Sequence, residues 1–350
     1  MRCARLLGAL LLALGAARCA TLATGAGDDD APRPTASAGP FREARPEELG
    51  STSALPAPYL LRKENRRFRE ASALPLDDRP LGETALYVVA EDAAGNPGGI
   101  YRFVAPDARR FSASPESPVL TAEAAWEGAS IGEPEAHRVG DEIFVYYSGR
   151  DGIGLARSRD GVSFTREPSP VLGAAGGGAW EAGAAPASPA LLEVGPDDYR
   201  LFYAAGGRIG EARSRDGVRF DRVSDAPALE PAGGGGGDEP PFDSESVAEP
   251  SAVLMRSAEG RLITRLYYAG RGPGGKRAIG MAARFGTDGA FTRALAPVFA
   301  ATRDARSPSV VIRPGVSLLY LTENSGATGS ALYPAIALGV APGNVALAAP

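Results

Sequence analysis

The chain has 350 residues, with 37 Lys and Arg against 42 Asp and Glu for a formal charge of -5, and 44% of its residues are apolar, as in an ordinary globular protein. The slightly acidic balance argues against a nucleic-acid partner, and the lack of a second long apolar run excludes a multi-span membrane protein. Its 45 glycines and 30 prolines favour many short strands joined by turns, which predicts an all-β fold.

The N-terminus has the pattern of an export signal. Arg2 and Arg5 supply a positive region, and the apolar stretch 6–17 that follows is too short to span a bilayer. We therefore predict a signal peptide over residues 1–18, which is removed from the fold, and an extracytoplasmic location for the mature protein.

Two alternatives remain for how the signal is processed. Residues 16–19 resemble a bacterial lipoprotein box with Cys19 as the lipidated residue, although Arg18 stands where a small residue is expected. The other alternative is ordinary cleavage after Ala23 or Ala26, which releases the protein. The chain has only two cysteines, both near the signal, so no disulfide framework is expected and a membrane would be reached only through a lipid anchor.

The segment after the signal, residues 19–56, is rich in Pro, Ala, Gly and Asp and lacks apolar periodicity. Such a composition predicts a flexible linker that tethers the folded domain. We assign the domain to residues 57–342 and a short C-terminal tail to residues 343–350.

An internal repeat is the most informative feature of the domain. Each copy combines an Xaa-Pro pair, a strand of the Tyr-Tyr-Ser-Gly type, an Ile-Gly-x-Ala segment with an Asp-Gly pair, and a Pro-Val-Leu segment. The Xaa-Pro pairs are Glu133-Pro134, Ser188-Pro189, Glu249-Pro250 and Ser307-Pro308. Their spacings of 55, 61 and 58 residues suit one four-stranded antiparallel blade per repeat. With a divergent copy over residues 85–120, the sequence predicts a five-bladed β-propeller.

Two elements of the repeat are interpreted as structural. Asp160, Asp216 and Asp288 each precede a glycine and are predicted to form two-residue hairpin turns. The paired aromatic residues in the middle strands, such as Tyr146 and Tyr147, are predicted to lie in the core.

The residue before each repeated proline is the candidate for chemistry. In a propeller the innermost strands surround a central channel, so this position brings side chains from different blades together. Around the ring it holds Glu133, Ser188, Glu249 and Ser307, with Leu74-Pro75 near the same register in the first blade. The proline is kept while its neighbour changes chemical type, which is typical of a differentiated site rather than of a purely structural one.

These motifs resemble those of the five-bladed propeller glycosidase superfamily, which includes arabinanases, xylosidases, fructosidases and mannoside phosphorylases. The resemblance covers residues 57–342 and rests on the Trp-Glu, Xaa-Pro, Tyr-Tyr-Ser-Gly, Asp-Gly-x-x-Phe and Pro-Val-Leu segments. It implies a glycan ligand, a base or nucleophile carboxylate on the first blade, a supporting carboxylate on the second and a general acid on the third.

The chain departs from that layout. The first copy has no acid in register, although Asp77 and Asp78 lie close by, and the third copy has Ser188 where a carboxylate is expected. Glu133 and Glu249 are two blades apart, as the base and the acid are in the superfamily. The resemblance therefore implies Glu249 as general acid and Glu133 as base of a glycoside hydrolysis.

Other polar and aromatic residues are candidates for substrate binding. Glu135 and His137 follow Glu133 at a period of two, so all three would lie on one strand face and hold a sugar hydroxyl or a cation, although one His with two acids is a weak metal signal. Trp126 and Trp180 would stack on sugars or pack at the blade start. Further candidates are Ser188, Asp243 and Ser307. No cofactor and no metal ion is predicted.

Three classes of function remain open on the sequence. The first is an exported glycoside hydrolase that uses the paired carboxylates. The second is a catalytically inactive glycan-binding propeller, and the third is a protein-interaction scaffold with an inert channel. A sialidase-type propeller is a distant fourth, because the Asp-Gly turn resembles an Asp-box only loosely.

Overall fold

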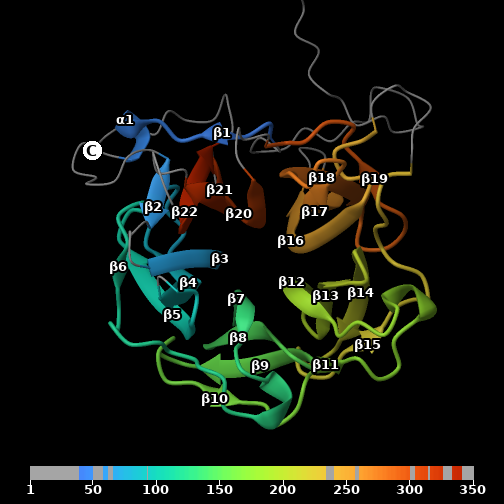
Figure 1. Ribbon diagram of the computed structural model, residues 1–350, viewed down its shortest axis with the longest axis horizontal. Helices are drawn as coiled ribbons and strands as arrows, with labels where there is room; N and C mark the ends of the chain where they lie inside the picture. The colour runs from blue at the N-terminus through green and yellow to red at the C-terminus, as the bar shows by residue number, and fades with distance from the viewer. Residues whose placement is uncertain are drawn as a thin grey trace, which may run out of the picture.

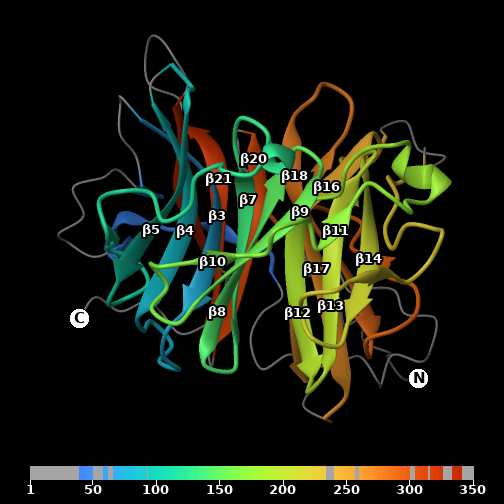
Figure 2. The ribbon, with the colours of Figure 1, turned by 90° about the horizontal axis from the view of Figure 1, so that it is seen from below.

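The computed structural model describes residues 39–49, 58–61, 66–92, 94–233, 240–256, 260–299, 304–313, 316–325 and 333–340. Five antiparallel sheets stand around a common axis like the blades of a propeller, with β3, β7, β12, β16 and β20 innermost (Figure 1). The prediction of an all-β, five-bladed propeller with four-stranded blades is confirmed. Seen from the side, the strands cross the thickness of the ring (Figure 2).

Each blade is a short meander that runs outward from the axis. The first blade comprises β3 (Arg66–Pro75), β4 (Thr84–Asp92), β5 (Pro97–Ala105) and β6 (Ser112–Ala113). The second comprises β7 (Gly132–Val139), β8 (Glu142–Gly149), β9 (Gly152–Ser158) and β10 (Thr165–Arg166), with β11 (Leu172–Gly173) also paired to β9. The third comprises β12 (Ala187–Gly195), β13 (Asp198–Ala205), β14 (Arg208–Ser214) and β15 (Asp221–Arg222).

The fourth and fifth blades follow the same plan. The fourth comprises β16 (Ser246–Arg256), β17 (Leu262–Arg271), β18 (Arg277–Phe285) and β19 (Thr292–Arg293). The fifth comprises β20 (Ala305–Arg313), β21 (Val316–Ser325) and β22 (Tyr333–Val340), completed by β1 (Arg42–Glu43) and β2 (Tyr59–Leu61). Among the described residues, the helical pieces are α1 (Pro46–Leu49) and two 3-10 turns, η2 (Ala125–Glu127) and η3 (Ala179–Glu181).

The fifth blade joins segments from the first and the last part of the described chain, because β1 and β2 pair with β22. Residues 39–49, predicted as part of the flexible linker, therefore belong to the propeller. Phe41 and Leu49 are buried there, and Arg42 donates to the Glu48 carboxylate at 2.5 and 2.7 Å. Two isolated apolar residues give no periodicity, so the sequence pattern could not reveal this packing.

Several predictions lie outside the described residues: the signal peptide over 1–18, lipidation of Cys19, most of the linker and the tail over 343–350. Among the residues that the structure describes, no helix is long and apolar enough to cross a membrane.

The core lies between the blades, where apolar side chains of adjacent sheets meet. The predicted core aromatics are confirmed: Tyr146, Tyr147, Phe202 and Tyr203 are fully buried. The hydroxyl of Tyr146 also donates to the Gly217 carbonyl of the next blade at 2.6 Å. Adjacent blades are thus held together by apolar contacts. Between the second and third blades, a hydrogen bond from Tyr146 to the turn at Gly217 adds to these contacts.

The Asp-Gly turns differ in part from the prediction. Asp160 Oδ1 accepts the backbone N–H groups of Val162 and Ser163, each at 2.8 Å, so this residue does shape a turn. However, β9 and β10 are joined by residues 159–164 and not by a two-residue hairpin. The extra residues carry the apolar Phe164 back onto the core, which a two-residue connection is too short to do.

Candidate functional site

Five residues, one from the innermost strand of each blade, surround the axis of the propeller. We call these five residues the ring. Each lies at a register shift of its strand and has a positive φ. They are Glu70 (56°), Glu133 (48°), Ser188 (49°), Glu249 (52°) and Ser307 (48°). Non-glycine residues adopt this left-handed region at a cost and persist there when the surroundings impose it. The bulge points all five residues into one narrow pocket on the axis.

The first blade corrects the predicted register. Its ring residue is Glu70, followed by Ala71, and not Leu74-Pro75. The sequence pattern missed Glu70 because this copy lacks the proline that marks the other four. Asp77 lies beyond the strand, where its carboxylate accepts the backbone N–H groups of its own turn. The ring therefore contains three carboxylates, on the first, second and fourth blades.

Hydrogen bonds tie each ring carboxylate to the next blade. Oε2 of Glu70 accepts the Glu133 backbone N–H at 2.9 Å, Oε2 of Glu133 accepts that of Ser188 at 2.9 Å, and Oε2 of Glu249 accepts that of Ser307 at 2.7 Å. The ring acids are thus fixed in orientation by bonds between blades. The second oxygen of each carboxylate is the one left for chemistry.

The surroundings of the three second oxygens differ. Oε1 of Glu70 forms an ion pair with Arg69, and Oε1 of Glu249 lies 3.6 Å from Nη1 of Arg277. Both hydrogen bonds to Glu133 are accepted by Oε2, from the Ser188 backbone N–H and from the Ser148 hydroxyl at 2.7 Å. Oε1 of Glu133 has no hydrogen bond or ion pair within the described residues. Glu133 therefore presents a carboxylate oxygen that is open to a ligand.

Burial and mutual repulsion favour the protonated form of two ring acids. Burial, followed by the charge of Glu133, raises the pKa of Glu70 to about 7. The same two causes, in the same order, raise the pKa of Glu249, whose side chain is only 13% exposed. A carboxyl group with a raised pKa, Glu249, thus lines the same pocket as a second acid, Glu133, and acid–base chemistry needs two such groups.

A second tier of side chains lies two residues further along each inner strand. Ser72 accepts the Ala136 backbone N–H at 2.9 Å, and Ser251 accepts that of Val310 at 3.1 Å. The second blade has Glu135 at this level, which accepts the Ser72 hydroxyl at 3.1 Å and the Leu191 backbone N–H. Burial raises the pKa of Glu135 to about 8, so this tier holds a neutral carboxyl group near pH 7.

His137 lies below Glu135 on the same strand, and its Nε2 is 3.5 Å from a carboxylate oxygen of Glu193 on β12. Burial lowers the pKa of His137, while Glu193 acts in the opposite direction. No group of three or more His, Cys, Asp or Glu among the described residues is arranged to hold a metal ion.

The tryptophans are not part of the ring. Trp126 stacks on Tyr147 with a centroid separation of 6.0 Å, and Trp180 packs on Tyr203 at the same distance. A Cβ on Gly154 would lie 2.4 Å from the Trp126 ring, which explains the glycine of the Ile-Gly-x-Ala segment. Both tryptophans thus pack against tyrosines of their own blades.

Glu127, which follows Trp126, and Asp243, which follows Phe242 at the matching place before the fourth blade, make the same kind of structural contact. Asp243 accepts the Tyr268 hydroxyl at 2.8 Å and pairs with Arg293 at 2.6 Å, while Glu127 bonds Tyr147 and Arg166 in the same way. Asp243 is fully buried and is not brought to the ring. The predicted site residues that do line the ring pocket are Glu133, Glu135, Ser188, Glu249 and Ser307.

The pocket enclosed by the ring has a volume of about 30 Å³. That volume admits water but not a sugar ring. A ligand larger than water would therefore lie across the mouth of the channel, with the ring carboxylates below it. Ser307 Oγ is buried there without a hydrogen-bond partner among the described residues, so it is available to a ligand hydroxyl.

Scans against protein-family models and curated protein sequences found no match. Solved structures do match. A putative glycoside hydrolase from Bacteroides ovatus aligns with a TM-score of 0.61 and 14% identity over 86% of this chain and 96% of its own. An endo-arabinase from Bacteroides thetaiotaomicron aligns with a TM-score of 0.54 and 14% identity, over 80% and 96%.

A third similar structure is an α-L-arabinofuranosidase from Podospora anserina, solved with cellotriose, with a TM-score of 0.56 and 10% identity over 81% of this chain and 94% of its own. At these identities the likeness concerns the fold. The chain has the five-bladed propeller fold of glycoside hydrolases, and the structural resemblance inferred from the repeat is confirmed.

Proposed function

We propose that this protein is an exported glycoside hydrolase whose ring carboxylates cleave a glycan bound across the channel mouth. The observation that carries the proposal is the convergence of Glu70, Glu133 and Glu249 from three blades into one narrow pocket. Three buried or half-buried acids at positive φ are costly for folding, and a solely structural ring could use serine throughout, as two blades do.

Each acid is assigned a role from its surroundings. Glu249, with its raised pKa, is the general acid that donates a proton to the leaving oxygen. Glu133, with Oε1 unpartnered, is the base that activates water or the nucleophile that attacks the sugar. Glu70 is the least exposed of the three and is paired with Arg69, so it acts as the supporting carboxylate.

A catalytically inactive glycan-binding propeller is the second candidate. It is favoured by Ser188, which stands on the third blade where the resemblance implies an acid, and by the use of every Oε2 in a bond between blades. This candidate predicts that the protein binds a glycan with its ring intact and releases no product.

The test is release of reducing ends by the protein without its predicted signal peptide, on a panel of plant, fungal and bacterial polysaccharides. The matched variants are Glu249→Gln and Glu245→Gln, since Glu245 is an exposed acid on the same blade. Hydrolysis that disappears in Glu249→Gln and persists in Glu245→Gln supports the proposal. Binding without hydrolysis would favour the second candidate.

The proposal includes export, after which the mature protein is either attached to a membrane through a lipid on Cys19 or released. It is supported by the charge and apolar pattern of residues 1–18. Labelling with a radioactive fatty acid, lost in Cys19→Ala, distinguishes the anchored form from a protein released by cleavage after Ala23 or Ala26.

A further inference from the structure

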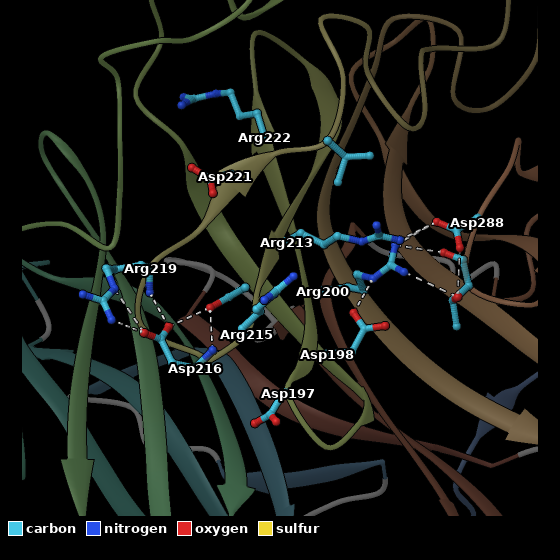
Figure 3. A pocket seen from close by; sticks show the side chains of 13 residues that line it. Asp197, Asp198, Arg200, Arg213, Arg215, Asp216, Arg219, Asp221, Arg222 and Asp288 are labelled. Atoms are coloured by element: carbon cyan, nitrogen blue, oxygen red, sulfur yellow. Dashed lines mark hydrogen bonds and ion pairs between the residues drawn. The ribbon is translucent and has the colours of Figure 1, made fainter.

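A second cavity, of about 830 Å³, lies at the end of the third blade opposite the ring. Figure 3 shows the side chains that line it. Its walls are the β12–β13 turn, the ends of β14 and β15, and the turn after β18. From Ser188 to Asp197 along β12 is a span of about 30 Å of extended chain, so the cavity is remote from the ring carboxylates. We call it the arginine cleft, because Arg213, Arg215 and Arg219 face it.

The second blade shows what the same surface looks like when its charges are paired. There Arg157 donates to Glu167 at 2.6 Å, and Arg159 lies 3.9 Å from Glu142. Both arginines therefore have acids of their own blade beside them. The strand registers of the two blades match, since Phe144 opposes Arg157 just as Arg200 opposes Arg213.

The third blade has lost both of these pairs. Val223 occupies the place of Glu167, so Arg213 reaches instead to Asp288 of the fourth blade at 2.7 Å. Arg200 occupies the place of Phe144, and its Nε donates a hydrogen bond to the Asp198 carboxylate at 3.1 Å. Asp198 is the counterpart of Glu142, and Arg215 is the counterpart of Arg159.

Within the described residues Arg215 consequently keeps no ion pair, although the acids Asp197 and Asp221 also line the cleft. Arg215 is exposed and forms no hydrogen bond or ion pair within the described part of the chain. Figure 3 shows it between the Arg219–Asp216 pair on one side and the Arg200–Asp288 group on the other. These neighbours fix the walls of the cleft while the central guanidinium stays open to a ligand.

Val223 adds an apolar surface to the cleft. It is 45% exposed and is one of two large apolar residues that are exposed in the described structure. An open guanidinium and an exposed valine that line the same cleft suit a ligand with an anionic group and an apolar face. A sugar acid has both, because its ring carries C–H groups on one face and a carboxylate at its edge.

We propose that the arginine cleft binds a uronate unit of an acidic glycan. Arg215 and Arg213 donate to the sugar carboxylate, Arg213 exchanging part of its contact with Asp288, and the C–H face of the sugar packs on Val223. The cleft volume is within the range of about 300–1,000 Å³ that is usual for small-molecule sites. This site does not depend on the ring, and it stands whether or not the ring is catalytic.

The test measures binding of tri-galacturonate by titration calorimetry at low salt, with uncharged galactotriose as the matched probe. Val223→Glu restores the acid that the second blade has at this place and keeps every arginine. Arg215→Ala removes the open guanidinium, and Arg159→Ala is its control on the second blade. Glu133→Gln changes the ring alone, so weaker binding in this variant would show that tri-galacturonate binds at the ring.

The expected result is that tri-galacturonate binds and galactotriose does not. Val223→Glu and Arg215→Ala each weaken binding by about tenfold or more, while Arg159→Ala and Glu133→Gln leave it unchanged. Wild-type protein that ignores tri-galacturonate, equal binding of the uncharged probe, or binding lost only in Glu133→Gln would overturn the proposal. Hydrolysis at the ring with an empty cleft would reject this inference and leave the proposed function intact.

Discussion

The ring and the arginine cleft lie at opposite ends of the third blade's inner strand, and they differ in how the repeat has been altered. At the ring, the backbone of all five copies is the same, with positive φ at one bulge, and only the side chain varies. Acids were kept on three blades and tied to the neighbouring blade. At the cleft, an acid has been lost and another diverted, which leaves Arg215 unpaired.

The comparison teaches that two different departures from a repeat point to function. One is variation of chemical type at a position whose geometry is constant, as at Glu133, Ser188 and Glu249. The other is the loss of a partner that the same residue has in a sister blade, as at Arg215 beside Arg159. The aromatic and acid pairs at Trp126 and Glu127 show neither departure, and they are packing elements.

The largest expected effect is a loss of catalytic rate, which should follow substitutions in the ring and not substitutions in the arginine cleft. Glu133→Gln and Glu249→Gln should each lower kcat by about 10²- to 10⁴-fold, because each removes a group that transfers a proton or attacks in the transition state. Arg215→Ala should leave kcat on a short neutral substrate unchanged. Initial rates of the three variants check this, and a loss of kcat in Arg215→Ala would break the separation.

The floor of the cleft should matter for stability. Arg200 is 1% exposed and pairs with the buried Glu211 at 3.0 Å, which Arg284 also contacts. Arg200→Ala should lower the free energy of unfolding by about 3 kcal/mol, because it leaves part of a buried charge uncompensated. Arg213→Ala, at the exposed edge, should cost less than about 1 kcal/mol. Urea unfolding measures both, and equal costs would show that the cleft has no rigid floor.

Below the ring, Glu135 should make stability depend on pH. Its pKa is about 8 in the folded protein against an ordinary 4.5, so the folded state holds its proton more tightly than the unfolded state. Its favourable contribution is complete below pH 4.5 and is lost as the pH rises through 8. Glu135→Gln should therefore be more stable than wild type by about 5 kcal/mol at pH 9 and no more stable at pH 4.

Thermal melts from pH 4 to 9 measure this difference. Asp141→Asn, which changes an exposed acid at the end of the same strand, is the control and should track wild type throughout. A stability gain in Glu135→Gln that does not change with pH would show that the carboxyl is not the buried acid described above.

The smallest effect concerns coupling within the ring. The charge of Glu133 helps to raise the pKa of both Glu70 and Glu249. Glu133→Gln removes that charge, so the pKa of each remaining acid should fall toward its ordinary value without reaching it, because burial stays. Carbon-detected NMR of the side-chain carboxyls follows both titrations, and unchanged values would mean that the three acids act independently.

Much of the fold could be predicted from the sequence because the repeat marks it redundantly. The Xaa-Pro pairs located four of the five ring residues, and the proline is informative since it lies at a bulge where no ladder hydrogen bond is needed. Glu70 was missed because Ala71 follows it. Its role depends on contacts with Arg69 and Glu133, which no local pattern encodes.

The cleft could not be predicted for a related reason. Asp288 precedes a glycine as Asp160 and Asp216 do, but it pairs across the seam with Arg200 and Arg213. The attachment of residues 39–49 to β22 was likewise hidden, because strand pairing between distant segments leaves no periodic signal in so short a stretch. Sequence patterns report contacts within a blade and are silent on contacts between blades.

The most direct test of the central claim, that Glu249 protonates the leaving group in the ring, is the dependence of Glu249→Gln on leaving-group acidity. A series of aryl glycosides of the sugar that the panel identifies would be hydrolysed by wild type and variant. An acidic phenol needs no proton to depart, so the variant should approach the wild-type rate for the best leaving groups and fall far behind for the poorest. A loss that is the same for every leaving group would contradict the assignment.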